Sequence, residues 1–241
     1  MSEFIYKYRN FEGKHLDILR KKELWLASPE SLNDPFDCQI EYAELFEAAI
    51  SKLQISLKSI QSFKSAALEV VSNLRVLSLS RGELNPLLWA HYSDSHKGFC
   101  LGFDEYQLGM SERMKPQKVE YTNELPSLTF SERLLKSNFK DKSHLIELIS
   151  TLEEFTYEVA LTKPKEWKVE NEFRIVHKHP MQGNVRKFHR LALREVIFGL
   201  NIDEANQEII IEILATDEWK HVKLFKIEKG LGSFNLTKTQ V

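Results

Sequence analysis

The stretch WKVENEFRIV, residues 167–176, alternates charged and apolar residues. Neighbouring side chains of a β-strand point to opposite faces, so the alternation predicts a strand with two different faces. One face would carry Lys168, Glu170, Glu172, Arg174 and Val176. The other face is largely apolar and predicts the side that packs on the core; it consists of Trp167, Val169, Asn171, Phe173 and Ile175. The charged face is then either a surface ladder of ion pairs or the wall of a functional site.

Further segments predict an α+β or mixed α/β fold. Strand patterns occur at residues 4–9, 24–28, 75–80, 99–104, 194–199 and 220–229, the last of which we expect to be the final strand. Helical patterns occur at 13–23, 41–74, 85–98, 144–161 and 203–215, with Asn85 as an N-cap and Gly98 as a stop for the third of them. No Pro/Gly/Ser-rich linker divides the chain, so we expect one domain, 1–241, with helical insertions at about 41–74 and 110–160.

Composition indicates a soluble cytoplasmic protein. The 241 residues are 42% apolar, which is enough for one sizeable core. The 33 basic and 35 acidic residues give a net charge of -2, so the chain lacks the strongly basic balance of a protein that coats nucleic acid. Two cysteines, Cys38 and Cys100, provide no disulfide framework and suit a reducing compartment. No stretch approaches the ~18 apolar residues of a membrane span.

Several polar residues are candidates for a site. Arg9 ends an aromatic strand and is either a solvent-facing strand end or a ligand contact. Asn33, Asp34 and Asp37 lie in SLNDPFDC, where short polar side chains equally explain a turn. Ser78 and Ser80 share a strand face, and Tyr92 lies at the end of a short helix; we include them as further candidates.

Familiar catalytic and metal motifs do not appear in the sequence. There is no Gly-rich phosphate loop, nucleophile elbow or kinase signature. His91 and His96 are five residues apart, which is not the spacing that places two imidazoles on one metal from a helix. Cys100 lies in an apolar strand, where a thiol is normally inert. We therefore expect no metal.

Glu170 and Glu172 carry the strongest functional hypothesis. If their face is exposed, they form weak surface ion pairs with Arg174. If it lines a site, one carboxylate can stabilise a cationic transition state at a sugar carbon while its neighbour orients the attacking group.

Five motifs, taken in order, resemble a widespread bacterial family of unknown function, domain family 2971. They are YKYR (6–9), LWLASPESLNDPFDC (24–38), LLWAHYSDSHKGFCLGFD (87–104), WKVENEFRIV (167–176) and REVIFG (194–199). More distantly, the opening order of basic strand, helix, leucine-rich strand and polar loop is similar to the ADP-ribosyltransferase fold. That similarity implies a split mixed or antiparallel sheet with helical insertions.

The ADP-ribosyltransferase similarity also implies site residues. Arg9, or Lys7 beside it, would be the first-strand basic residue that holds NAD. Ser78 or Ser80 would be the serine element, or Tyr92 the aromatic one. Glu170-Asn171-Glu172 resembles the Glu-x-Glu motif, and TKPKEW (162–167) would be the loop that meets the acceptor.

In the implied mechanism, NAD is a substrate. Tyr8, Tyr92 or Trp89 would stack on nicotinamide. Glu172 would stabilise the ribose cation, Glu170 would orient or deprotonate the acceptor, and Arg174 would favour their charged forms. The acceptor is an unknown protein or nucleic acid, the oligomeric state is open, and a role as a toxin or in phage defence is the guess that the family suggests.

Apart from a purely internal pairing of the face, in which Arg174 and Lys168 neutralise the two glutamates and the polar loops are structural, two alternatives stay open at this point. One is a nucleic-acid-processing enzyme that holds a divalent metal with Asp34, Asp37, Glu170 and Glu172. The other is a non-catalytic module that binds nucleic acid or protein through aromatic strands and the basic loops 163–168 and 186–190.

Overall fold

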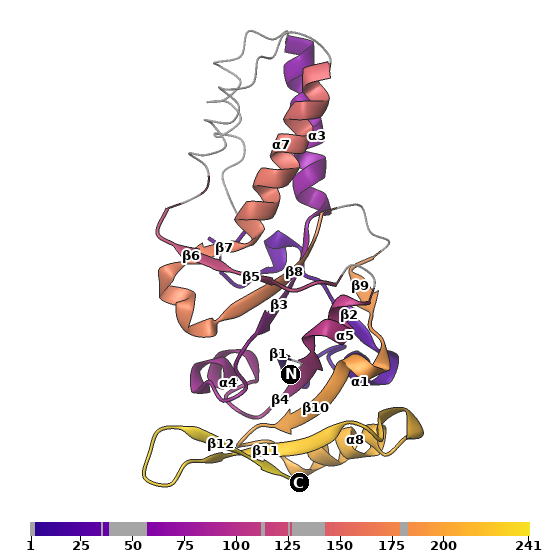
Figure 1. The fold of residues 1–241 in the computed structure, drawn as a ribbon, viewed down its shortest axis with the longest axis vertical. Coiled ribbons are helices and arrows are strands. Elements are labelled where there is room, and N and C mark those ends of the chain that lie inside the picture. The colour runs from indigo at the N-terminus through magenta and orange to yellow at the C-terminus, as the bar shows by residue number, and fades with distance from the viewer. Residues whose placement is uncertain are drawn as a thin grey trace.

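A mixed sheet of eight strands forms the centre of the computed structural model, in the order β12-β11-β10-β4-β1-β3-β8-β5 (Figure 1). The structure describes residues 3–34, 36–38, 57–111, 114–124, 126, 143–178 and 183–241. The strands of this sheet are β1 (Phe4–Arg9), β3 (Arg75–Ser80), β4 (Phe99–Asp104), β5 (Gln117–Lys118), β8 (Glu172–His177), β10 (Leu193–Phe198), β11 (Lys223–Lys229) and β12 (Leu236–Gln240). Only β10 and β11 pair in parallel; the other neighbours are antiparallel.

Two short sheets and several helices surround the main sheet. β2 (Glu23–Trp25) pairs with β9 (Val185–Lys187), and β6 (Glu120–Thr122) pairs with β7 (Thr162–Pro164). The helices are α1 (Asp17–Lys21), α3 (Leu57–Asn73), α4 (Pro86–Tyr92), α5 (Glu105–Gly109), α7 (Ser143–Ala160) and α8 (Glu204–Leu214). Short 3-10 turns are η1 (Pro29–Ser31), η2 (Lys165–Glu170), η3 (Arg190–Ala192) and η4 (Asp217–Trp219). The architecture is therefore α+β, as predicted.

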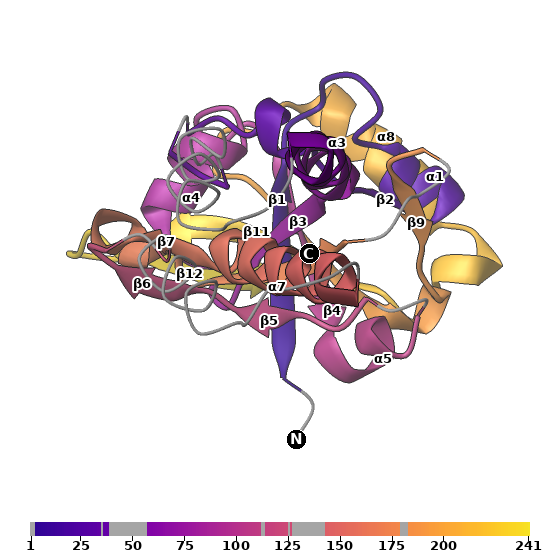
Figure 2. The same cartoon turned by 90° about the horizontal axis from the view of Figure 1, so that it is seen from above.

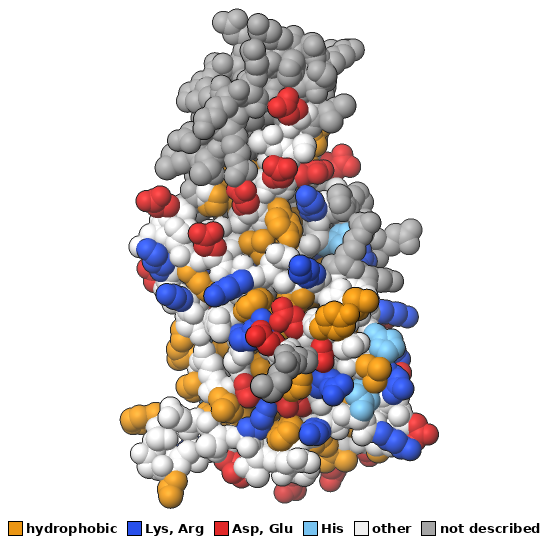
Figure 3. Space-filling model, viewed as in Figure 1, with side chains coloured by type: hydrophobic (Ala, Val, Ile, Leu, Met, Phe, Trp, Pro, Cys, Tyr) orange, Lys and Arg blue, Asp and Glu red, His pale blue; other side chains and the backbone are white. Residues whose placement is uncertain are grey.

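The long helices α3 and α7 lie side by side and project beyond the sheet (Figures 1 and 2). On the face shown in Figure 3, acidic side chains gather over this pair of helices. α1 packs next to α8 on one side of the sheet (Figure 2). Within the described ranges, none of the helices has the length and apolarity that crossing a bilayer requires.

The apolar core covers both faces of the main sheet. Ile5, Leu77, Phe103 and Ile175 belong to the larger cluster, which continues into α1 and α8. Tyr6, Tyr8, Trp89 and Cys100 belong to the cluster on the α4 side. Phe173 also packs against the larger cluster, so the prediction that the Phe173 and Ile175 face of β8 is the core side is confirmed.

The sheet opens between β1 and β3, and this opening positions the site. Their ladder has a single register pair, Tyr6 with Ser80. Beyond it, toward Arg9, the strands diverge, and the Lys7 side chain bonds to β3 where the ladder is missing: Lys7 Nζ donates to the Ser78 carbonyl oxygen at 2.6 Å. Just past the end of β3, the carbonyl oxygen of Gly82 accepts a hydrogen bond from Tyr8 Oη at 2.6 Å. Buried backbone oxygens need hydrogen-bond partners, and these side chains supply them, so the sheet can open here without leaving these carbonyl groups unpaired.

Several predictions about elements need correction. The helix predicted at 13–23 spans only Asp17–Lys21, and the helix predicted to stop at Gly98 ends at Tyr92. The strand expected at 167–176 starts only at Glu172, because 165–170 form η2 and Asn171 has a φ of 43°. The second predicted strand ends at Trp25 instead of residue 28, and 220–229 is followed by another strand, β12. The insertion predicted as helical at 110–160 begins with β5 and β6, and α7 starts at residue 143. The part of the 41–74 prediction before residue 57 lies outside the described residues.

Candidate active site

A pocket of about 280 Å³ lies where β1 and β3 diverge. Its walls include most of the predicted site residues: Tyr8, Arg9, Asn33, Ser78, Ser80, Tyr92, Glu170 and Glu172. These residues come from β1, β3, α4, η2, β8 and the loop after η1. Both faces of β1 contribute to the walls, through Tyr6 and Lys7, so the pocket reaches through the plane of the sheet. Arg174 lies behind the pocket and does not line it.

Strand register brings the serine and glutamate candidates onto one face. Ser78 pairs with Arg174, and Ser80 pairs with Glu172. Because directly paired residues of neighbouring strands point the same way, the Ser face of β3 and the charged face of β8 are continuous. This face is buried, with Arg174 fully inaccessible and Glu172 4% exposed. The surface-ladder interpretation of the charged face is therefore wrong.

Arg174 anchors this buried face. Its Nε and Nη2 donate to the two oxygens of Glu172 at 2.7 and 3.1 Å. Its Nη1 and Nη2 donate to the two oxygens of Asp37 at 2.8 and 2.6 Å. Nη1 also donates to the carbonyl oxygen of Ala160. A guanidinium that binds two carboxylates in this forked manner fixes both of them in place.

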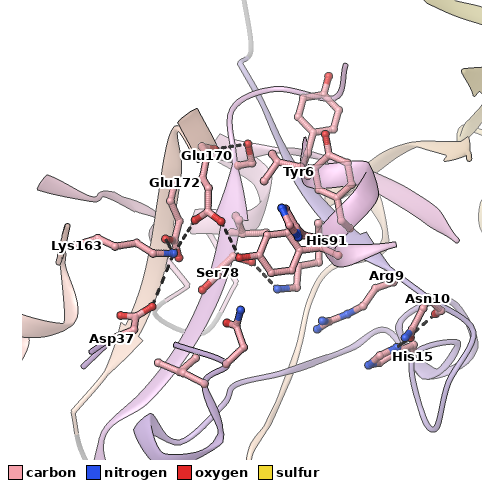
Figure 4. A pocket seen from close by; sticks show the side chains of 18 residues that line it. Tyr6, Arg9, Asn10, His15, Asp37, Ser78, His91, Lys163, Glu170 and Glu172 are labelled. Carbon is pink, nitrogen blue, oxygen red and sulfur yellow. Dashed lines mark hydrogen bonds and ion pairs between the residues drawn. The ribbon is translucent and has the colours of Figure 1, made fainter. Parts of the chain in front are cut away.

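Lys163, on β7, is the second cation of the cluster. Its Nζ lies 2.6 Å from Glu170 Oε2, 3.1 Å from Glu172 Oε2 and 3.8 Å from Asp37 Oδ2. Figure 4 shows the Lys163 amino group pointing between these carboxylates. Burial would lower the pKa of Lys163, but the carboxylates outweigh it and raise that pKa, so Lys163 is an ammonium at neutral pH.

Glu172 is held as an anion. Burial alone would raise its pKa, but Arg174 and Lys163, together with a hydrogen bond from Ser78, lower it to about 2. The backbone N–H of Glu172 donates to Tyr121 Oη at 2.8 Å. Glu172 therefore presents a fixed negative charge to the pocket at any physiological pH.

Glu170 reaches the same pocket from η2 instead of from the strand. Tyr92 Oη donates to Glu170 Oε1 at 2.6 Å, and Ser80 Oγ donates to the Glu170 carbonyl oxygen at 2.8 Å. Asn85 Nδ2 holds the preceding carbonyl, that of Val169, at 2.8 Å. Burial, followed by the hydrogen bond to Glu170, raises the pKa of Tyr92, so its hydroxyl remains a donor.

The opposite side of the pocket is cationic. Arg9 lies there with Asn10 and His15, across from the glutamates (Figure 4). Burial lowers the pKa of Arg9 to about 10, which leaves it charged at neutral pH. Its buried Nε has no hydrogen-bond partner among the described residues. A charged guanidinium whose buried Nε–H has no partner among the described residues is suited to binding an anion.

A second hollow of about 300 Å³ adjoins the first and shares Lys7, Arg9 and Ser78 with it. Trp25, which is half exposed, and His91 add aromatic surface to this hollow. Burial, followed by the proximity of Arg9, lowers the pKa of Lys7 well below its usual range. The two hollows thus meet at the basic residues of β1.

The carboxylates of the pocket are poorly suited to a metal. Among the described residues, no group of three or more His, Cys, Asp or Glu side chains has the geometry to hold an ion. Asp37, Glu170 and Glu172 already share Lys163 and Arg174, which a divalent cation would have to displace. Asp34 caps a turn instead, accepting the N–H of Phe36 at 2.9 Å.

Sequence reasoning missed two members of the site. Lys163 lay inside the predicted TKPKEW loop but was not assigned a role, because an isolated lysine carries no local signal of burial. Asp37 was predicted only as a turn residue or metal ligand, and its pairing with Arg174 spans 137 positions. Its presence in a polar loop next to Cys38 gave no indication of that partner.

Comparisons with known proteins agree with the motif analysis over part of the chain. Neither the curated proteins nor the solved structures contain a significant match to this chain. Residues 88–175, from α4 into β8, match the model of the family described as "Protein of unknown function (DUF2971)", which confirms the family resemblance predicted from the sequence motifs.

Proposed function

We propose that the protein is an ADP-ribosyltransferase-like enzyme. It binds NAD in the pocket between β1 and β3, cleaves the bond between nicotinamide and ribose, and transfers ADP-ribose to a protein or nucleic-acid acceptor. One observation carries the proposal: the neighbouring strands β1, β3 and β8 supply Arg9, Ser78 with Ser80, and Glu172 to the same pocket. That is the order and chemistry that the similarity to ADP-ribosyltransferases implies.

The charge distribution of the pocket supports NAD as the substrate. One wall carries Glu170 and Glu172, and Arg9 lies on the opposite side. NAD has a positively charged nicotinamide ring at one end and a negatively charged diphosphate in its middle. A pocket polarised in this way can hold both groups at once.

The size of the site also fits a dinucleotide. Ligands of this kind occupy pockets of roughly 300–1,000 Å³. The first hollow is too small for a whole dinucleotide, but the adjoining hollow extends it past Lys7 and Arg9. Two ring-shaped ends would then lie on either side of the basic residues. The Tyr8 and Tyr92 rings offer flat surfaces to one of them.

Each side chain would have a defined task in this reaction. Arg9 would bind a phosphate oxygen through its free Nε–H. Glu172 would stabilise the positive charge that develops on the ribose as nicotinamide leaves, because it is ionised and immobile. Glu170, which faces the same pocket, would accept the proton of the attacking group. The buried tyrosines would exclude water.

No specific observation favours either the metal-dependent nucleic-acid-processing enzyme or the non-catalytic binding module. A metal-dependent nuclease would use the carboxylates that Lys163 and Arg174 already occupy. A purely binding module would not need two glutamates buried at the pocket wall, since buried charges are expensive to desolvate.

The test is NAD binding and nicotinamide release by the purified protein. We expect NAD to raise the melting temperature and nicotinamide to be released. Glu172→Gln should abolish release and Arg9→Gln should weaken the thermal shift. Glu208→Gln, the same change at an exposed position of α8, is the matched control and should behave as the wild type. Absence of both the thermal shift and nicotinamide release in the wild type would refute the proposal.

A further inference from the structure

Lys163 occupies an unusual position for a lysine. It is 5% exposed, and it comes from β7, which pairs with β6 and not with the main sheet. Its ammonium group contacts Glu170 and Glu172 together, and the ring of Trp167 lies 4.9 Å away. A long side chain carries a large entropy cost when it is fixed in this way. A lysine is rarely buried to this extent unless it is paired with acidic groups.

Arg174 cannot replace Lys163 in the cluster. Within the part of the chain that the structure describes, the Arg174 guanidinium donates side-chain hydrogen bonds to Glu172, Asp37 and Cys38, and none to Glu170. Among the described residues, Lys163 is the cation that bridges Glu170 and Glu172. Without it, two neighbouring carboxylates would repel each other at the pocket wall.

We propose that Lys163 is a positioning residue of the enzyme, which holds the carboxylates of Glu170 and Glu172 side by side at the pocket. The catalytic part of this inference rests on the proposed function; the structural part does not. The ammonium orients Glu170 from one side while Tyr92 orients it from the other. It also keeps Glu172 ionised next to a second negative charge.

The charged and titratable groups around the glutamate pair come from every element that packs against it. They are Lys163 on β7, Arg174 on β8, Lys7 on β1, Tyr92 on α4, Tyr121 on β6, and Asp37 and Cys38 in the loop after η1. Of the residues that the structure describes, Lys163 and Arg174 are the ones that form ion pairs with the two glutamates. Removal of Lys163 therefore leaves one ion-paired cation for three carboxylates, and protonation of Glu172 becomes easier.

The test combines carboxyl carbon NMR with enzyme kinetics on Lys163→Met. Lys223→Met, which removes an exposed lysine of β11, is the matched control. In the NMR titration, run without NAD, we expect the pKa of Glu172 to rise from about 2 by at least roughly one unit in Lys163→Met and to stay in place in the control. The Glu172→Gln variant assigns the signal.

Kinetics then tests the catalytic part. We expect the acid limb of nicotinamide release to move to higher pH in Lys163→Met, with at least a tenfold lower kcat and a smaller change in KM. In Lys163→Arg the acid limb of nicotinamide release should return part of the way to its wild-type pH, because arginine restores the positive charge but has a different shape. If Lys163→Met does not fold, Lys163→Arg provides the test. An unchanged pKa of Glu172 together with a lowered kcat in Lys163→Arg supports the positioning role of Lys163. A kcat equal to that of the wild type overturns that role.

The outcomes separate the two proposals. An unchanged Glu172 pKa in folded Lys163→Met overturns the role of Lys163 whether or not the protein releases nicotinamide. A raised pKa in a protein that neither binds NAD nor releases nicotinamide keeps the charge role of Lys163 and refutes the transferase.

Discussion

Replacing Glu172 by glutamine tests the energetics of the buried cluster directly. The change removes one negative charge and keeps the size of the side chain. Arg174 and Lys163 remain buried, but each loses an anionic partner. Breaking a buried ion pair by removing one partner is strongly destabilising, because the other charge stays uncompensated. We therefore expect the variant to be less stable than the wild type at neutral pH.

The pKa of Glu172 gives the size of the effect. It falls from 4.5, the ordinary value of an exposed glutamate, to about 2 in the folded protein. One pKa unit corresponds to about 1.4 kcal/mol, so the difference corresponds to about 3 kcal/mol of folding free energy. Because the folded pKa is the lower one, this stabilisation is complete above about pH 4.5 and is lost as the pH falls toward 2.

Urea unfolding, followed by circular dichroism at neutral pH and at lower values down to about 3, measures this difference. The wild type should exceed Glu172→Gln by about 3 kcal/mol at neutral pH, and the gap should narrow to roughly 1.4 kcal/mol at pH 3. Glu208→Gln, at an exposed position of α8, should match the wild type throughout. A gap below about 1 kcal/mol at neutral pH, or one that is the same at every pH, would refute the reasoning.

The remaining predictions concern the frame of the pocket. Gly98→Ala would place a Cβ 2.0 Å from the Arg9 carbonyl oxygen, so we expect a loss of about 1–3 kcal/mol in urea unfolding and a smaller NAD-induced thermal shift. Ser95→Gly relieves a φ of 53° at an exposed position and should stabilise by about 0.5–1 kcal/mol in the same assay. Asn85→Ala removes the α4 N-cap and the bond to Val169, and should cost about 1–2 kcal/mol and speed amide exchange at the start of α4.

The pattern of the sequence predicted most of the main sheet. The strands at 4–9, 75–80 and 99–104 have the predicted bounds, because alternation and β-rich composition are local properties. Asn85 caps α4 as predicted. β12 was not predicted, because its sequence LTKTQ is polar and it becomes a strand by pairing with β11. β5, with two residues, carries no periodicity at all.

The candidate site was predictable in its residues but not in its contacts. Alternation at 167–176 placed Glu172 and Arg174 on one face, which the strand from Glu172 onward confirms. It gave the wrong local structure for Glu170, because the positive φ of Asn171 that ends η2 is visible only in the backbone. The burial of this face could not be predicted, because it involves Asp37 and Lys163, which lie in other segments of the chain.

Stability alone does not explain this cluster. Three carboxylates and two cations are buried together, and apolar residues of similar size often stabilise a fold at least as well as buried ion pairs. The cluster is also one positive charge short of neutral, so it leaves a net negative charge beside the pocket. Across that pocket Arg9 holds a buried donor without a partner among the described residues. A net negative charge and a buried Arg9 donor without a partner among the described residues both cost stability, and a ligand that carries both charges would offset that cost. The proposed binding of such a ligand would explain a feature that folding energetics does not explain.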